Sequence, residues 1–122
     1  QSQILKGTSR STKDNGHNMN SPIRIIEGLT VTRSNTVYDY VQLSFGKEIG
    51  ISIYNEINIS PESISVEVLV GRVVTTVTEH ENAIEIKFFD GTQLTIDMHR
   101  QAYRGPEALE LHRYGHPPVI WN

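Results

Sequence analysis

The sequence contains no cysteine, so disulfide bonds, thiolate nucleophiles and cysteine-ligated zinc are all excluded. It also lacks long apolar runs, since none of its hydrophobic segments approaches the roughly 20 residues needed to cross a bilayer. The N-terminal segment shows no charged and then apolar pattern of a secretion signal. From these absences we expect a soluble protein of the cytoplasm.

The first 18 residues differ from the rest of the chain in composition. They are rich in Ser, Thr, Asn, Gly and Lys, and only Ile4 and Leu5 place two large apolar side chains together. Such a segment cannot build a core element, so we expect residues 1–18 to be a flexible tail and residues 19–122 to be one domain. Met19 is a candidate natural start, with the preceding stretch either added for expression or a native flexible arm.

Most of the negative charge lies outside this tail. Residues 19–122 carry 8 basic and 13 acidic side chains, so the net charge of -3 for the whole chain becomes -5 for the expected domain. Nucleic-acid binding depends on clustered Lys and Arg, so this balance disfavours DNA and RNA as partners. It favours a basic protein partner, which long-range attraction would steer toward an acidic surface.

Short runs of alternating apolar and polar residues, rich in Val, Ile, Thr, Tyr and Phe, follow one another from Leu29 onward. Because helical periodicity is nearly absent, this alternation predicts an all-β domain. An antiparallel meander that forms a sandwich or a partly open barrel would bury the apolar faces. The segment from Ser21 to Gly28 is compatible with one helical turn, a strand or coil. The expected strands are Leu29–Arg33, Val37–Phe45, Ile49–Asn55, Ser65–Val70, Val73–Thr78, Ala83–Phe89, Gln93–Met98, Ala108–His112 and Val119–Trp121.

Two parts of the chain share one apolar pattern. A shift of 43 positions lays Val41–Phe45 on Ile84–Phe88 and Ile51–Ile53 on Leu94–Ile96, which suggests two repeated three-stranded halves. In each hairpin a three-residue loop keeps one face apolar, whereas a two-residue loop would not. The predicted cross-strand pairs are Leu43 with Ile51, Val41 with Ile53, Ile86 with Leu94, and Ile84 with Ile96.

The face opposite these apolar residues differs between the two halves. In the first half, the register places Tyr40 across from Tyr54 and Tyr38 across from Glu56. In the second half, the same face carries Glu81, Glu85, Asp97 and His99. We expect these eight residues to bind a protein partner, because Tyr is enriched at protein contacts. The alternative is that another sheet or loop of the same domain covers the tyrosines.

No residue pattern points to catalysis or to a cofactor. No serine lies in a nucleophile elbow, no carboxylate pair stands out, and the glycines are isolated turn residues rather than a phosphate-binding loop. The histidines of the expected domain lack the spacing of a metal site and are better explained as solvated surface residues; they are His80, His99, His112 and His116. We therefore expect no enzymatic activity, no metal and no cofactor.

Basic residues concentrate in one segment, from Arg100 to Arg113, around the turn Arg104-Gly105-Pro106. A solvated loop that pairs with nearby acids is the ordinary interpretation. The more specific interpretation is that the segment forms a pocket for an anion or a carboxylate, which would make the domain a small-ligand-binding barrel or an enzyme. A homo-oligomeric structural subunit, joined through the tyrosine face, is a further alternative.

Several segments together resemble small bacterial proteins of the toxin-immunity kind. They are Leu43-Ser-Phe-Gly46 to Ile53-Tyr-Asn55, Ile86-Lys-Phe-Phe-Asp-Gly91, Tyr103-Arg-Gly-Pro-Glu-Ala-Leu109 and Val119-Ile-Trp-Asn122. The resemblance is at the level of the overall fold, covers about residues 31–122, and includes no catalytic motif. It implies a compact acidic body that masks a toxin domain, often a basic nuclease. We therefore expect a non-catalytic immunity protein that occludes the active site of its toxin.

Overall fold

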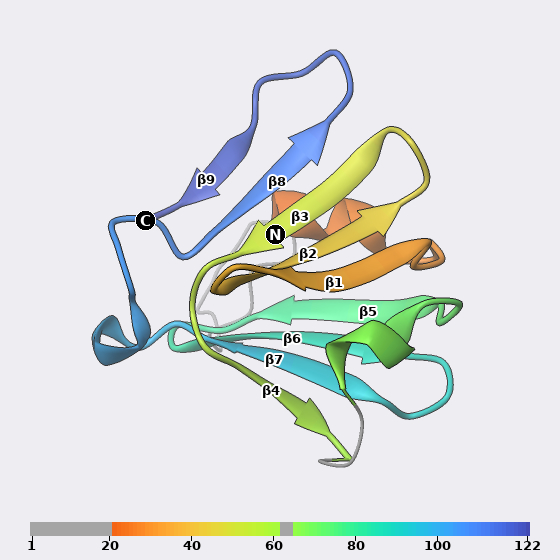
Figure 1. Cartoon of the computed structure of the whole chain (residues 1–122), viewed down its shortest axis with the longest axis horizontal. Helices are drawn as coiled ribbons and strands as arrows, with labels where there is room; N and C mark the ends of the chain where they lie inside the picture. The colour runs from red at the N-terminus through yellow and green to blue at the C-terminus, as the bar shows by residue number, and fades with distance from the viewer. Residues whose placement is uncertain (1–20, 62–64) are drawn as a thin grey trace, which may run out of the picture.

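The computed structural model describes residues 21–61 and 65–122, which form two antiparallel β-sheets around one core (Figure 1). The five-stranded sheet has the order β1-β2-β3-β8-β9 and the four-stranded sheet the order β4-β7-β6-β5. The predicted all-β fold is confirmed, as a sandwich rather than a closed barrel. The strands are β1 (Arg33–Val37), β2 (Tyr40–Phe45), β3 (Ile49–Ile53), β4 (Ile57–Ser60), β5 (Val74–Glu79), β6 (Ala83–Phe88), β7 (Gln93–Asp97), β8 (Leu109–Arg113) and β9 (Val119–Trp121).

Two halves of the chain exchange strands. Each half first forms a three-stranded meander, β1-β2-β3 in one sheet and β5-β6-β7 in the other. The next strand of each half then crosses to the sheet of the other half, so β4 pairs with β7 and β8 pairs with β3. Figure 1 shows the β3–β4 and β7–β8 links on the same side of the molecule. The sequence pattern predicts the two meanders but not this exchange.

The repeat also includes two 3-10 helices, η1 (Pro22–Ile26) and η2 (Val66–Leu69). Both helices bury residues three positions apart, Ile23 and Ile26 in η1 and the two end residues of η2. Each helix is followed, two residues after its end, by a glycine with positive φ. Each packs on the first strand of the other half, η1 on β5 and η2 on β1. The halves therefore share helix, glycine and meander in one order.

Glu27 links η1 to β5 through a side-chain hydrogen bond. Its Oε2 accepts a hydrogen bond from the Val77 N–H at 2.8 Å and lies 3.0 Å from Nε of Arg24. Partial burial opposes ionisation of this carboxyl, but the hydrogen bonds from Arg24 and Val77 outweigh it and lower the pKa of Glu27. The ionised form of Glu27 is therefore the one that holds the helix in place.

The predicted registers of the two hairpins are confirmed. The observed pairs are Leu43 with Ile51, Val41 with Ile53, Ile86 with Leu94, and Ile84 with Ile96. The first hairpin turns through the three residues between Phe45 and Ile49, with a positive φ of 82° at Gly46. In the second hairpin the N–H of Phe88 donates to the carbonyl of Thr92 at 2.9 Å, so the loop again has three residues, with a positive φ of 91° at Gly91. Glycine adopts this conformation without the steric cost that a β-carbon would impose.

The inward faces of both sheets form a single hydrophobic core. Alternation within the strands explains its composition, since every second residue of β2, β6 and β7 is buried and its neighbours are less so. Trp121 packs against this core from the end of β9, and its indole N–H donates to Oε2 of Glu79 at 3.1 Å. The β8–β9 hairpin that closes the chain was predicted and is confirmed.

Two strand predictions in the first half are wrong in their bounds. The segment predicted as Leu29–Arg33 makes only an isolated bridge, from Thr30 to Val73, and β1 begins where that prediction ends. The long strand predicted over Val37–Phe45 is divided by a turn between β1 and β2. The alternation in residues 37–45 continues across this turn, so it conceals the reversal of the chain.

The strand predicted over Ser65–Val70 is also wrong, because the segment forms η2. Burial of Val66 and Leu69, three positions apart, requires a helical turn and leaves Val68 and Val70 exposed. Conversely, β4 was not predicted, because four residues that pair only with distant β7 carry little local signal. The expected tail, residues 1–18, lies outside the described residues.

Candidate functional site

The predicted pairing of Tyr40 and Tyr54 is confirmed. Tyr40 opens β2 and Tyr54 directly follows β3, and both rings lie on the outer face of the five-stranded sheet. Their ring centroids are 5.3 Å apart and their planes are tilted by 48°. Burial and the negative charges of Glu110 and Glu107 raise the pKa of Tyr54, so its hydroxyl remains protonated.

A pocket of about 140 Å³ opens beside these rings, and we call it the tyrosine pocket. The loop before β8 forms one of its walls. Arg104 holds this loop in place, since its Nη1 donates to the carbonyl of Asp39 at 2.7 Å and its Nη2 lies 4.0 Å from Oε2 of Glu56. The tyrosines are thus half-covered by their own domain but remain accessible. The pocket is lined by Asp39, Tyr40, Tyr54, Arg104, Gly105, Pro106 and Glu107.

Tyr38 does not lie across from Glu56, so that part of the predicted register is wrong. The chain reverses at Tyr38 and Asp39, in a two-residue turn between β1 and β2, and Tyr38 therefore leaves the sheet. Its φ is 56° and its side chain is 95% exposed. Tyr38 projects into solvent at the tip of a hairpin, next to the residues that line the tyrosine pocket.

A second pocket, of about 300 Å³, lies on the outer face of the four-stranded sheet, and we call it the acidic pocket. Oδ1 of Asp97 accepts a hydrogen bond from the backbone N–H of His99 at 2.9 Å and lies 2.8 Å from Nδ1 of its ring. These two contacts lower the pKa of Asp97 and keep it ionised. The lining residues are Glu56, Ile57, Asn58, Asn82, Ala83, Thr95, Asp97 and His99.

The two pockets adjoin where the chain passes from β3 to β4. The Asn55 side chain donates from Nδ2 to the carbonyl of Asp97 at 2.8 Å, and the N–H of Asp97 donates to the carbonyl of Glu56 at 3.0 Å. Glu56 lines the acidic pocket and also faces Arg104 of the tyrosine pocket. Six of the eight predicted residues therefore lie around one corner of the sandwich. We call this region the contact surface; it comprises Tyr38, Tyr40, Tyr54, Glu56, Asp97 and His99.

The other two predicted residues lie farther along the second half. Glu81 is exposed in the turn between β5 and β6. Glu85 lies on the outer face of β6, opposite Thr95 of the acidic pocket, and its Oε1 is 3.6 Å from Nε2 of His80. The structure thus places Glu85 beside the contact surface, whereas Glu81 lines neither pocket.

The basic segment from Arg100 to Arg113 is not one cluster. Arg104 belongs to the tyrosine pocket, before the start of β8, while His112 and Arg113 lie at the far end of that strand. Five residues of extended strand separate these ends by about 15 Å. The single anion pocket considered for the whole segment is therefore wrong, because β8 carries its basic residues to opposite ends of the sheet.

Ser52, His112 and Glu110 come together on the outer face of the five-stranded sheet, but not as a hydrolase triad. Nε2 of His112 lies 3.3 Å from Oγ of Ser52 and 3.4 Å from Oε1 of Glu110. A triad uses the two ring nitrogens for base and orienting acid, whereas here both contacts fall on the same nitrogen. Ser52 is also only 4% exposed, so a substrate could not reach its hydroxyl.

The carboxyl groups around the tyrosine pocket interact with one another. A hydrogen bond with Glu110 raises the pKa of Glu107, with a contribution from the charge of that neighbour. Among the residues that the structure describes, no group of three or more His, Asp or Glu side chains is placed to hold a metal ion. The geometry provides hydrogen-bond acceptors, aromatic faces and negative charge, which are groups that recognise a basic surface.

The sequence pattern gives no indication that Arg104, Pro106 and Glu107 form a wall of the tyrosine pocket. The Arg104-Gly105-Pro106 turn was visible, but only as a basic loop. Its position over the tyrosines depends on the pairing of β8 with β3, which joins residues far apart in the chain. The local pattern carries no signal for such a contact.

Within residues 21–61 and 65–122, no helix is long and apolar enough to span a membrane. Comparison with known proteins adds no relative from which a function could be transferred. No family model matches the chain, and neither a curated protein nor a solved structure is detectably similar to it.

Proposed function

We propose that this chain is a protein-binding module that acts as an immunity protein. Its contact surface would bind a basic toxin domain and block access to the toxin's active site, without chemistry of its own. The role places the chain in the cytoplasm of a bacterium that carries the toxin. The observation that carries the proposal is the position of Tyr38, because this residue combines local strain with full exposure.

Tyr38 occupies a position that suits glycine better than tyrosine. Two-residue hairpin turns with positive φ at the first position are dominated by glycine, because a β-carbon is strained there. A ring that is 95% exposed buries almost no apolar area that could offset this strain within the domain. Strained residues persist most often at sites that bind or react, and an exposed tyrosine is suited to fill a hollow on a partner.

The chemistry around Tyr38 fits a basic partner. Tyr40, Tyr54 and Glu107 line a pocket large enough for a single side chain. Aromatic faces and carboxylates both attract Lys and Arg. Asp97 adds ionised charge on the adjoining pocket, so the contact surface presents negative charge on both sides of its corner.

The test uses the product of the gene next to the one that encodes this chain. Its C-terminal domain is expressed in a bacterial host with and without the full chain, and growth is measured. We expect growth arrest that the wild-type chain relieves and that Tyr38→Gly relieves poorly. Purified proteins are then titrated by calorimetry, and the complex should form with one chain per toxin domain.

Tyr114 provides the matched control, since it is also an exposed tyrosine, at 82%, but belongs to the β8–β9 loop away from the contact surface. Tyr114→Ala should relieve growth arrest as well as the wild type does. Equal relief by the Tyr38 and Tyr114 variants would show that the contact surface is misplaced. Absence of both toxicity and binding would refute the immunity role.

Self-association is the competing use of the same surface. Sedimentation of the chain alone distinguishes the two, because an immunity protein that binds through this surface should leave it unoccupied in the absence of toxin. A dimer that Tyr38→Gly converts to a monomer would favour the homo-oligomeric structural role instead.

A further inference from the structure

The two crossing strands, β4 and β8, occupy equivalent places in the two sheets. Leu109 of β8 pairs with Ile53 of β3. Ile57 of β4 pairs with Ile96 of β7, which lies 43 positions after Ile53 in the sequence. Ile57 is therefore the counterpart of Leu109, and two residues later Ile59 corresponds in the same way to the next inward residue of β8.

The pairing of β4 with β7 leaves main-chain groups of β4 pointing away from the sheet. The N–H of Asp97 donates to the carbonyl of Glu56 at 3.0 Å, so every second residue from Glu56 onward bonds toward β7. The residues between them, Ile57 and Ile59, direct their N–H and C=O groups to the outer edge. Within residues 21–61 and 65–122, no strand or loop pairs with that edge.

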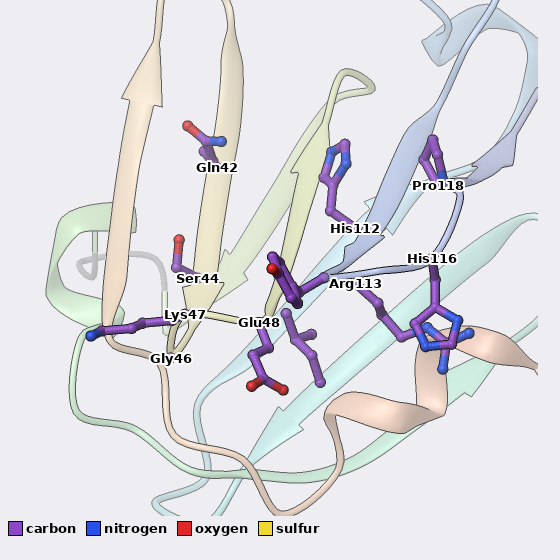
Figure 2. Close-up of a pocket in the computed structure, with 12 residues that line it drawn as sticks. Gln42, Ser44, Gly46, Lys47, Glu48, His112, Arg113, His116 and Pro118 are labelled. Carbon is purple, nitrogen blue, oxygen red and sulfur yellow. The ribbon is translucent and has the colours of Figure 1, made fainter.

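The equivalent edge of the other sheet is covered by β9. After β8 the chain reverses through a loop that ends at Pro118 (Figure 2), and β9 then pairs with Leu109 and Leu111. Both leucines are fully buried. Ile57 and Ile59 pack against the core but are only partly buried. In the described part of the chain, β4 thus lacks the neighbour that its counterpart has.

The other long outer strands are covered. η2 packs on β1, and η1 packs on β5, where the Glu27 carboxylate accepts the N–H of Val77. β9, which ends the five-stranded sheet, has only three residues. Figure 1 shows β4 at the margin of the molecule, with no described element on its outer side. β4 has no charged residue and no bulge, which are devices that keep strand edges from pairing with other chains.

We propose that the edge of β4 binds an extended segment of the partner protein, which joins the four-stranded sheet as an antiparallel strand. As in β9, the side chains opposite Ile57 and Ile59 face the core and are apolar. The side chain between them faces outward beside Asn58, which lines the acidic pocket together with the ionised Asp97. A Lys or Arg matches that charge, so the segment reads apolar, basic, apolar. The basic character of the segment rests on the proposed function, whereas the open edge does not.

The test is hydrogen exchange of the full chain, followed by NMR, alone and with the synthetic peptide Thr-Val-Lys-Val-Thr. We expect the amides of Ile57 and Ile59 to exchange at least about tenfold more slowly at saturating peptide, because they become hydrogen-bonded. The Asn58 amide already bonds to β7 and should change less. Peptide methylated on both Val nitrogens should not bind, whereas peptide methylated on the Lys nitrogen should, since only the Val N–H groups face β4. Equal binding of the two methylated peptides would overturn the proposal.

Ile59→Pro removes one outward N–H, and proline is tolerated where the N–H of an edge strand faces solvent. This variant should bind the unmethylated peptide at least about tenfold more weakly than the wild type. Ile59→Val is the matched control, because valine is close to proline in size and keeps the N–H, and it should bind as the wild type does. Equal binding by the folded Ile59→Pro and Ile59→Val variants would contradict strand addition. If Ile59→Pro does not fold, the methylated peptides decide the question on the wild type.

The same exchange measurement on the complex with the toxin domain separates this inference from the immunity role. Toxin binding without protection of the Ile57 and Ile59 amides would refute strand addition and leave the immunity role intact. Protection by the peptide without any toxin binding would keep the edge as a peptide site and refute the immunity role. Protection that rises with the concentration of the chain alone would assign the edge to a second copy and overturn the proposal.

Discussion

Replacement of Tyr38 by glycine separates the local strain of this residue from its proposed contact with a partner. A β-carbon in the left-handed conformation costs about 1–2 kcal/mol, and the extra freedom of glycine in the unfolded chain offsets about 0.5–1 kcal/mol of the relief. Because the Tyr38 ring is 95% exposed, its removal costs little packing energy. We therefore expect the free energy of unfolding of Tyr38→Gly, measured in urea, to be unchanged or higher by up to about 1 kcal/mol.

The same substitution should weaken toxin binding. Truncation of an aromatic anchor costs ~2 kcal/mol or more, which is about thirtyfold in Kd and acts mainly on dissociation. Tyr38→Ala removes the ring but keeps the strained β-carbon, so it should bind as weakly as Tyr38→Gly without the gain in stability. Calorimetry and urea unfolding of both variants give the comparison. If Tyr38→Gly binds as tightly as the wild type, or loses more than 1 kcal/mol of stability, the assignment of Tyr38 as an exposed anchor is wrong.

Other substitutions test the contact surface and the fold. Tyr40→Ala and Tyr54→Ala should each raise the toxin dissociation rate about tenfold while circular dichroism stays native, and unfolded variants would show instead that the rings are structural. Asp97→Asn should slow association in stopped flow and flatten its salt dependence, because charge attraction is screened over about 10 Å at 0.1 M salt. The lowered pKa of Glu27 means that its stabilisation is present above its ordinary value of 4.5 and is lost as pH falls through the folded value. Urea unfolding from pH 7 to pH 3 should therefore show a shallower loss for Glu27→Gln than for the wild type. Leu43→Ala, at a fully buried position, should cost about 2–5 kcal/mol, and a smaller loss would place Leu43 outside the core.

The hairpins could be predicted because their information is local. A slip of one residue would turn every apolar side chain to solvent, so alternation and loop length together fix the pairing of β2 with β3 and of β6 with β7. The contact between Tyr40 and Tyr54 follows from the same register. Prediction of half of the tyrosine pocket therefore needed only the residues of one hairpin.

The remaining features depend on contacts between distant segments. The alternation of Val66, Val68 and Val70 indicates a strand, yet packing against β1 selects a 3-10 helix that buries Val66 and Leu69. The covering of the tyrosines by the Arg104 loop requires the crossing of β8 to the first sheet. The periodicity of the local sequence predicts neither contact. Each contact depends on which sheet faces and edges are still unpaired once the two meanders have formed.

The strand exchange explains why the aromatic and acidic pockets adjoin. Tyr40 and Tyr54 stand at the open end of the β2–β3 hairpin, and Ala83 and Asp97, shifted by 43 positions, pair at the open end of β6–β7. Each open end meets the segment that leads into a crossing strand, the Arg104 loop before β8 in one pocket and the start of β4 in the other. One backbone arrangement is therefore used twice with different side chains. Because both crossing links lie on the same side of the molecule, the two versions form one surface, and a partner that meets the tyrosines also meets the carboxylates.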